Sequence, residues 1–401
     1  MTVRGCADAR AATDGGAAPD ASVDGGAIDP VVTLAAAGRT ACALRASGVV
    51  SCWGANDNGQ LGDVGSRDGV CHDRGTGGDY PDHSVRAVMG PITGATRLAV
   101  GAGHVCVRVD GASHLGEARC WGDNGDGQLG RSTTSPVDPT PVTVVDAHGA
   151  PLTGVMDVAA WGQSSIAVTT AGLYGWGDGQ HGQIGTMTAT TFETTPLLAA
   201  LPAGVTLHGV AFTEASLGID GDGHARSWGW NKWGTLGRGT DADAAVVDFL
   251  PVPGLDAVLE VDVGLFAACA RTSSDVMCWG WPWTALARDG NHSECLLASG
   301  DGSSCPRSVS GLGGAPVAVA VSGSATCIAL QTGQVQCTSA TSEQLTTRGG
   351  LPPMATLVAG DEFFCGLTTD GRVFCWGRGS CGQTGDPALP DDGEPHEVVL
   401  P

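Results

Sequence analysis

Lysine, glutamate and long apolar runs are scarce in this sequence. Among 401 residues Lys232 is the only lysine, and glutamate occurs nine times against thirty-three aspartates. Charged residues that favour helices are therefore nearly absent, which argues against a helical bundle or coiled coil. No apolar run approaches the roughly 20 residues of a membrane-spanning helix. A net charge of −22 argues against a nucleic-acid partner, because phosphate neutralisation supplies most of that affinity.

Residues typical of turns are abundant instead. The sequence has 64 glycines and 21 prolines, well above average usage. Hydrophobic residues make up 42% of the chain, which is enough to bury a core and argues against wholesale disorder. The composition therefore predicts a folded protein in which many short elements are joined by turns.

A Trp-Gly pair recurs along the chain and is often followed by a turn similar to Gly-Gln-Leu-Gly. At the regular repeat position the pair occurs at six tryptophans, which are Trp53, Trp121, Trp176, Trp228, Trp279 and Trp376. The wide gap between the last two contains a degenerate copy, in which Thr338 takes the place of tryptophan. The sequence therefore contains seven units with a spacing of about 54 residues.

Each unit shows the same series of short alternating runs. In the first unit, residues 34–38 lead to a second stretch at 42–44, a turn at 47–48 and a return strand that ends at residue 54. A polar glycine-rich segment and a linker with a short valine-rich strand complete each unit. Period-2 runs bounded by Gly, Asp and Pro are typical of hairpins. Seven units of about four strands predict an all-β, seven-bladed β-propeller of antiparallel blades, because radial repetition shields sheet edges.

The repeated motif is Gly-x-x-His/Thr-x-Cys-x-Leu, a hairpin, and then Cys-Trp-Gly-x-Asn-x-x-Gly-Gln-Leu-Gly. It resembles the regulator of chromosome condensation repeat family over roughly residues 31–401, with the best copies at 38–62, 103–130 and 360–385. The resemblance implies a seven-bladed propeller. The resemblance is combined with the cysteine pattern and the N-terminal tether, both described below. On these grounds the chain is identified as a bacterial extracytoplasmic member of that family.

The repeat pattern also sets the domain limits. Residues 1–30 are rich in Ala, Asp and Gly and predict a disordered tether, whereas residues 31–401 form the propeller, with insertions at about 63–94 and 288–314. The last residues match the linker strand that precedes each later unit, and the first unit lacks a full strand of this kind. We therefore expect the C-terminal strand to close the ring by pairing with the first blade.

Five units place a cysteine on the second strand opposite a cysteine that precedes the repeat tryptophan. The third unit has Ile166 and Gly175 at these places and the fourth has Ser216 and Ser227, so both cysteines are present or absent together. Facing residues of an antiparallel pair lie within disulfide reach; reduced thiols in a cytosolic protein are the alternative. The predicted disulfides are Cys42–Cys52, Cys106–Cys120, Cys269–Cys278, Cys327–Cys337 and Cys365–Cys375.

Five cysteines lie outside these pairs. Cys295 and Cys305 share the insertion at 288–314 and are predicted to pair, and ring closure would bring Cys71 near Cys381. A zinc site is the weaker interpretation, because no Cys-x-x-Cys pair occurs and the histidines are scattered. We predict no metal and no cofactor. Many disulfides indicate an oxidising compartment.

Cys6 is the remaining cysteine, and its surroundings resemble the lipidation site of a bacterial lipoprotein. It follows Gly5 and precedes the Ala/Asp/Gly-rich tether. Residues 1–5 are too short for a signal peptide, so the hydrophobic segment would lie upstream of Met1. We predict a secreted or lipid-anchored protein at the cell envelope, with Cys6 as the candidate anchor; a plain disordered terminus with a spare thiol is the alternative.

Catalytic motifs are lacking. The sequence has no Gly-x-Ser-x-Gly elbow, no His-Glu-x-x-His and no phosphate loop. Asp220 and Asp222 lie in a Gly- and Asp-rich stretch typical of a solvated hairpin turn, since a calcium loop would need more ligands. His104 takes the usual histidine place of the repeat and is expected to be a hydrogen-bonded structural residue. We predict that the protein has no catalytic residues and is not an enzyme.

Four tryptophans outside the repeat positions are candidates for a binding surface. Trp230 and Trp281 both lie two residues after the repeat tryptophan, in adjacent blades. With Trp233 and Trp283 they are expected to cluster on one rim between blades four and five. Exposed aromatic patches mark interfaces, and tryptophan is enriched in binding hot spots. Packing of these side chains beneath the insertion at 288–314 is the alternative.

These features predict a non-enzymatic, extracytoplasmic scaffold that binds an unidentified protein through one propeller face. Adhesion to carbohydrate or the cell envelope through the tryptophan-rich rim is the alternative. An activity similar to the family's guanine-nucleotide exchange factor is less favoured, because of the predicted disulfides and the acidic tether. We expect a monomer without a nucleic-acid partner and without a transmembrane span.

Overall fold

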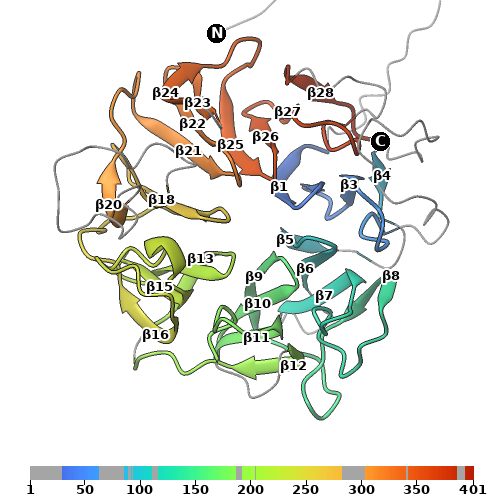
Figure 1. Cartoon of the computed structure of the whole chain (residues 1–401). Coiled ribbons are helices and arrows are strands. Elements are labelled where there is room, and N and C mark those ends of the chain that lie inside the picture. The colour runs from blue at the N-terminus through green and yellow to red at the C-terminus, as the bar shows by residue number, and fades with distance from the viewer. Residues whose placement is uncertain are drawn as a thin grey trace, which may run out of the picture.

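The computed structural model describes residues 29–62, 85–88, 92, 94–110, 116–186, 192–203, 205–281, 303–339, 342–385 and 393–401. These residues form seven four-stranded antiparallel sheets, arranged as blades of a ring (Figure 1). The helix among them is a single 3-10 turn, η1 (Lys232–Gly234). The prediction of an all-β, seven-bladed propeller is confirmed.

Each blade consists of four strands that are consecutive in sequence and paired in that order. Blades one to three contain β1 (Val31–Ala37), β2 (Thr40–Arg45), β3 (Val50–Gly54), β4 (Arg86–Ala87), β5 (Ala95–Val100), β6 (His104–Asp110), β7 (Gly116–Asp123), β8 (Val137–Thr143), β9 (Val155–Trp161), β10 (Ser164–Thr169), β11 (Gly172–Asp178) and β12 (Phe192–Leu198). Blades four and five contain β13 (Leu207–Phe212), β14 (Ala215–Asp220), β15 (Ala225–Trp230), β16 (Ala245–Pro251), β17 (Glu260–Val263), β18 (Ala267–Arg271), β19 (Val276–Gly280) and β20 (Ser303–Ser308). Blades six and seven contain β21 (Pro316–Val321), β22 (Thr326–Leu330), β23 (Val335–Ser339), β24 (Ser342–Thr347), β25 (Met354–Ala359), β26 (Phe363–Thr368), β27 (Val373–Gly377) and β28 (His396–Val398).

The degree of burial of a strand depends on its position between the central channel and the rim of the ring. The first strand of every blade lines the central channel, which has a volume of about 240 Å³. The second strand is buried along almost its whole length, as in β10 and β26, because both faces of a blade pack against neighbouring blades. The fourth strand, at the rim, is mostly half-buried, as in β12.

The repeat tryptophans join neighbouring blades. In blades one to five the buried indole N–H donates to a main-chain carbonyl oxygen in the glycine-rich loop of the preceding blade, at 2.8–3.0 Å. The bonds run from Trp53 to Gln383, Trp121 to Gln60, Trp176 to Gln128, Trp228 to Gln183 and Trp279 to Thr235. The first of these bonds joins blade one to blade seven.

Ring closure differs from the sequence prediction. The C-terminal strand β28 pairs with β27 and is the outer strand of blade seven, so the expected pairing with blade one is wrong. Blade one is complete without it, because β4 supplies its fourth strand. Side-chain interactions close the ring instead: Val31 and Trp53 of blade one share a buried cluster with Phe363 and Val398 of blade seven, and the indole of Trp53 donates to blade seven. Figure 1 shows these two blades side by side, in blue and red.

The cysteine pairs of the repeat are disulfides in all five units. In blade three, Ile166 faces Gly175 in their place. In blade four we expected Ser216 to face Ser227, but this prediction is wrong by one position, because Leu217 faces Ser227. Ser216 lies opposite the repeat tryptophan, and its hydroxyl donates to a main-chain carbonyl of blade three at 2.9 Å. Both blades therefore fill the disulfide position with an aliphatic side chain opposite a small residue.

Several predictions fall outside the described residues. Cys305 and Cys381 are each disulfide-bonded, but their predicted partners, Cys295 and Cys71, lie outside the described residues, as do Cys6 and most of the tether. These pairings and the tether stay predictions. The two predicted insertions contain β4 and β20, which are the outer strands of blades one and five.

Candidate binding surface

One end of the ring carries most of the loops that differ between blades. The first and third strands of a blade run parallel, because each is antiparallel to the second. The turn after the first strand and the loop after the third strand therefore emerge at the same end. We call this end the loop face, and the opposite end, which carries the turn between the second and third strands, the hairpin face.

Trp230 lies at the end of β15 on the loop face, two residues after the repeat tryptophan. Its ring stacks on His181 of blade three, with ring centroids 4.3 Å apart and an interplanar angle of 14°. Its indole N–H donates to Asp243 Oδ1 at 2.6 Å. Its main-chain N–H donates to the carbonyl of Glu214 at 2.8 Å. The ring is thus oriented from three sides yet remains partly exposed.

Trp233 extends the aromatic group toward blade five. It lies within η1 and has φ of 64° and ψ of 19°, a left-handed conformation that is costly for a bulky residue. Its ring stacks on Trp281 with centroids 4.5 Å apart and an angle of 13°. Trp281 in turn meets the edge of Phe266 at 5.6 Å. These three rings form one continuous, partly exposed aromatic group across blades four and five.

Lys232, the sole lysine of the chain, connects the two aromatic groups. Its Nζ lies 4.5 Å from the ring centroid of Trp230 and 5.6 Å from that of Trp233. Both distances are within the range of cation–π attraction, which is strongest for tryptophan. The loop face therefore already holds one cation against its tryptophan rings.

Carboxylates on blades two to four continue the surface on the other side of Trp230. Burial raises the pKa of Glu214, and the charge of Asp178 adds to this shift. Burial also raises the pKa of Asp126, and the charges of Asp178 and Asp123 raise it further. Within the described part of the chain none of these four carboxylates forms an ion pair. This region therefore carries an excess of negative charge, of which Lys232 offsets only a part.

The tryptophans and carboxylates occupy equivalent repeat positions in successive blades. Trp230 and Trp281 correspond to Asp123 and Asp178, and Trp233 corresponds to Asp126 and His181. The ring places these positions next to one another. We refer to the resulting patch as the aromatic–acidic surface, and it consists of Asp123, Asp126, Asp178, His181, Glu214, Trp230, Lys232, Trp233, Phe266 and Trp281.

The structure brings together three of the four predicted binding residues. Trp233 and Trp281 stack directly, and Trp230 joins them through Lys232. Trp283 lies outside the described residues. The sequence analysis did not predict that the carboxylates and His181 belong to this surface. An alignment of the repeats could have shown it, because Asp123 and Asp178 occupy the position of Trp230, and Asp126 and His181 occupy that of Trp233.

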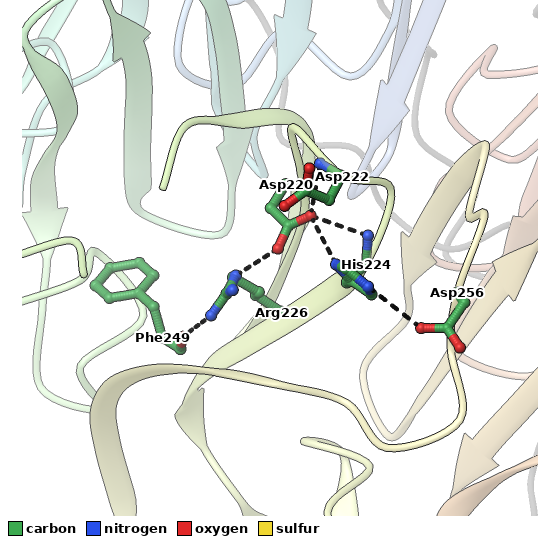
Figure 2. Close-up of polar contacts among 6 residues, drawn as sticks. All are labelled: Asp220, Asp222, His224, Arg226, Phe249 and Asp256. Carbon is green, nitrogen blue, oxygen red and sulfur yellow. Dashed lines mark hydrogen bonds and ion pairs between the residues drawn. The ribbon is translucent and has the colours of Figure 1, made fainter. Parts of the chain in front are cut away.

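The Asp220 group on the hairpin face is a turn. Asp220 Oδ1 accepts the main-chain N–H groups of Asp222 and His224 at 3.0 Å each, and Oδ2 accepts from Arg226 Nε at 2.8 Å. Although burial opposes it, these hydrogen bonds hold the pKa of Asp220 below its usual value. Figure 2 shows its carboxylate between Arg226 and His224, with Asp256 beyond. Asp220, Asp222 and His224 could approach one cation, but Arg226 already neutralises the buried carboxylate.

Two carboxylates in the central channel join blades five and six. Glu260 forms an ion pair with Arg271 at 2.6 Å and accepts the N–H of Val319 at 3.3 Å. Asp262 Oδ2 accepts the N–H of Val321 at 2.7 Å. Asp262 touches the channel but is enclosed by protein, and this burial raises its pKa to about 7. Both groups are engaged with the neighbouring blade, which indicates a structural role.

His104 is a buried structural residue. Its Nε2 lies 2.8 Å from the hydroxyl of Ser165, which itself donates to the carbonyl of Gln128 at 2.9 Å. The Ser165 hydroxyl oxygen thus accepts a hydrogen bond from the Nε2–H group of His104, and His104 Nδ1 has no hydrogen-bond partner among the described residues. Burial lowers the pKa of His104 to about 4, so the ring is neutral at pH 7. This geometry agrees with the structural role expected from the sequence.

A comparison with known protein families identifies two segments of the chain that match a repeat family. The family model of the Regulator of chromosome condensation (RCC1) repeat matches residues 31–60 and 355–383, in blades one and seven. One segment in each of these two blades therefore matches the RCC1 repeat. The human E3 ubiquitin-protein ligase HERC2 is 29% identical over 280 residues, which cover 68% of this chain and 5% of HERC2. This chain therefore spans only a small part of that relative.

Solved structures share the fold of this seven-bladed propeller. The human WBSCR16 structure has a TM-score of 0.72 and 19% identity, covering 88% of this chain and 95% of that one. The Prp20p structure from Saccharomyces cerevisiae has a TM-score of 0.66 and 18% identity, covering 89% and 87%. At these identities the likeness concerns the fold alone. In the described part of the chain, no helix has the length and apolar character needed to cross a membrane.

Proposed function

We propose that this RCC1-repeat propeller is a non-enzymatic scaffold that binds a protein partner through the aromatic–acidic surface. The observation that carries the proposal is the partly exposed group of Trp230, Trp233 and Trp281 at the junction of blades four and five. Tryptophan supplies a large, rigid contact area and is enriched among residues that dominate binding energy. Proteins of the same fold are consistent with this role, since the Prp20p structure is described with binding to Gsp1p and histones.

The location we propose is extracytoplasmic. Five disulfides within the blades favour an oxidising compartment, because cytosolic reductants keep such thiols reduced. A bacterial origin with a lipid on Cys6 would explain the acidic tether as a spacer from the membrane. Reading the codons upstream of Met1 tests the lipid anchor: an apolar in-frame segment is expected, and without one the anchor is abandoned.

Carbohydrate binding is the second candidate. Stacked indole rings such as Trp233 and Trp281 offer flat apolar faces on which sugar rings can lie. A role in nucleotide exchange has no specific observation in its favour among the described residues. The two candidates predict the same essential residues but different ligands, so one pair of variants can separate them.

The test uses a Trp230→Ala, Trp281→Ala double variant in two assays. Pull-down from envelope extract and a glycan array are each run with wild type and variant. A matched control is Met156→Ala, Leu198→Ala, which removes two exposed apolar side chains, 43% and 54% accessible, elsewhere on the molecule. We expect the tryptophan variant to lose partner binding about tenfold or more, and the control to keep it. Wild-type behaviour of the tryptophan variant in every assay would reject the proposed surface.

A further inference from the structure

The charges of the loop face are distributed unevenly around the ring. On blades one and seven, Arg39 pairs with Asp57 at 3.5 Å and Arg378 pairs with Glu362. On blades two to four, the described residues form no ion pair with Asp123, Asp126, Asp178 or Glu214, although Arg131 pairs with Asp138. A partner that covers blades two to five therefore meets negative charge and aromatic rings together.

Lys232 shows which chemical group this combination accommodates. Its ammonium lies over the faces of Trp230 and Trp233, and its charge acts on the Glu214 carboxyl. Only one lysine is available in the whole chain, and it lies where two indole faces meet the acidic group. A cation at this position gains both from the ring quadrupoles and from the carboxylates.

The remaining carboxylates are not satisfied by that single cation. Burial is the main reason that the pKa of Asp126 is raised, and the charges of Asp178 and Asp123 repel its carboxylate and raise the pKa further. Further positive charge from outside would relieve this repulsion. The net charge of −22 would in addition attract a basic partner over long range and accelerate encounter.

We propose that the aromatic–acidic surface recognises a basic segment of its protein partner, with an arginine or lysine side chain of the partner displacing Lys232 from Trp230 and Trp233. Further basic side chains of the segment pair with Asp126, Asp178 and Glu214. This inference rests on the proposed function and adds the chemistry of the partner. Lys232 then acts as an internal competitor that occupies the cation position until the partner arrives.

The competitor role predicts how peptide affinity changes when the Lys232 ammonium or the Trp230 ring is removed. The probe is a fluorescent ten-residue peptide of alternating glycine and arginine, with a glycine–glutamate peptide as its counterpart, titrated in about 0.15 M salt. Lys232→Met should bind the arginine peptide about threefold or more tightly than wild type, because the competing ammonium is gone. Trp230→Ala should bind it at least threefold more weakly.

A pair of charge-matched variants tests the location of the site. Asp178→Asn, Glu214→Gln removes two carboxylates of the surface, and Asp222→Asn, Asp256→Asn removes two from the hairpin face. We expect at least a fivefold loss of peptide affinity for the first pair and less than twofold for the second. Circular dichroism and melting temperature confirm that each variant is folded. Equal losses for both pairs, or weaker binding by Lys232→Met, would overturn the proposal.

The same experiments distinguish failure of the basic-segment inference from failure of the proposed function. If wild type fails to bind the arginine peptide below about 1 mM, while pull-down still depends on Trp230 and Trp281, the surface binds a protein but the basic-segment inference is wrong. If neither the peptide nor the pull-down depends on these tryptophans, the proposed function fails as well. Selective binding of a neutral glycan would also overturn the basic-segment inference.

Discussion

His104 and Asp262 are two enclosed residues that favour their neutral forms. Burial lowers the pKa of His104 from 6.5 to about 4 and raises that of Asp262 from 3.8 to about 7. The folded state therefore loses stability through His104 as pH falls from 6.5 toward 4. Through Asp262 it loses stability as pH rises from 3.8 toward 7, because the unfolded chain releases the proton more readily. The two effects oppose each other over the same pH range.

Asp262→Asn should therefore stabilise the protein at neutral and alkaline pH. Asparagine keeps an oxygen for the Val321 N–H but carries no charge that must be enclosed. We expect a gain on the order of 3 kcal/mol at pH 8, which shrinks steadily as pH falls through 7 toward 3.8. Melting temperatures of wild type and variant between pH 4.5 and pH 8 measure this difference, because the His104 contribution cancels between the two proteins.

The matched control for this experiment is Asp222→Asn. Asp222 is exposed on the hairpin face, so its neutralisation should leave the melting temperature almost unchanged at every pH. A pH-independent shift in Asp262→Asn, or a shift of equal size in the control, would contradict the role assigned to Asp262.

At the scale of elements, the indole bonds explain how separate four-stranded sheets become one ring. Blades one to five each donate an indole N–H to the preceding blade. Blade six has Thr338 at the tryptophan place, and the hydroxyl of Thr338 accepts the main-chain N–H of Thr326 within its own blade at 2.9 Å. In the described part of the chain, Trp376 of blade seven has no carbonyl partner in blade six. The channel carboxylates of β17 supply alternative hydrogen bonds between blades five and six.

A comparison of two tryptophan variants tests the contribution of the indole bond. Trp121 and Trp376 are both buried repeat tryptophans, but only Trp121 donates to a carbonyl, that of Gln60, at 2.9 Å. Trp121→Phe should cost about 1 kcal/mol more free energy of unfolding than Trp376→Phe, since it also leaves a buried carbonyl without its donor. Denaturant titrations of both variants measure the difference. Equal losses would mean that the indole hydrogen bond adds no stability beyond the packing of the ring.

At the scale of the whole molecule, closure depends on contacts between the two ends of the described chain. Val398 of β28 is buried in the cluster that joins blades seven and one. Arg45 of blade one donates from Nη2 to the carbonyl of Pro401 at 2.6 Å. The C-terminal strand therefore stabilises the ring through side chains and a terminal hydrogen bond, while its ladder bonds stay within blade seven.

Removal of residues 394–401 should lower the melting temperature sharply, because blade seven loses its outer strand and the closing cluster loses Val398. Val398→Ala isolates the second effect and should cost about 2 kcal/mol of unfolding free energy. Val399 is 82% exposed, so Val399→Ala is the matched control and should leave stability unchanged. If the truncated protein melts like wild type, the C-terminal strand has no part in closure.

The local pattern of the sequence was sufficient for the strands, the number of blades and the five blade disulfides. Cysteines such as Cys42 and Cys52 are ten residues apart and pair across one hairpin, so period-2 alternation and the turn determine their register. Blade four shows the limit of this reasoning. The sequence pattern predicted that Ser216 faces Ser227, but the strand pairing places Leu217 opposite Ser227 and Ser216 opposite Trp228.

Tertiary structure alone decided closure and the composition of the binding surface. Trp230, His181 and Asp126 lie in different repeats, and no periodicity within a repeat says which side chains meet across a blade boundary. Their contacts depend on how each blade packs against the next, and this packing is a property of the closed ring. The scarcity of lysine and the closeness of Lys232 to Trp230 and Trp233 were evident from the sequence, but only the ring places this segment beside His181 and the acidic group of the preceding blades.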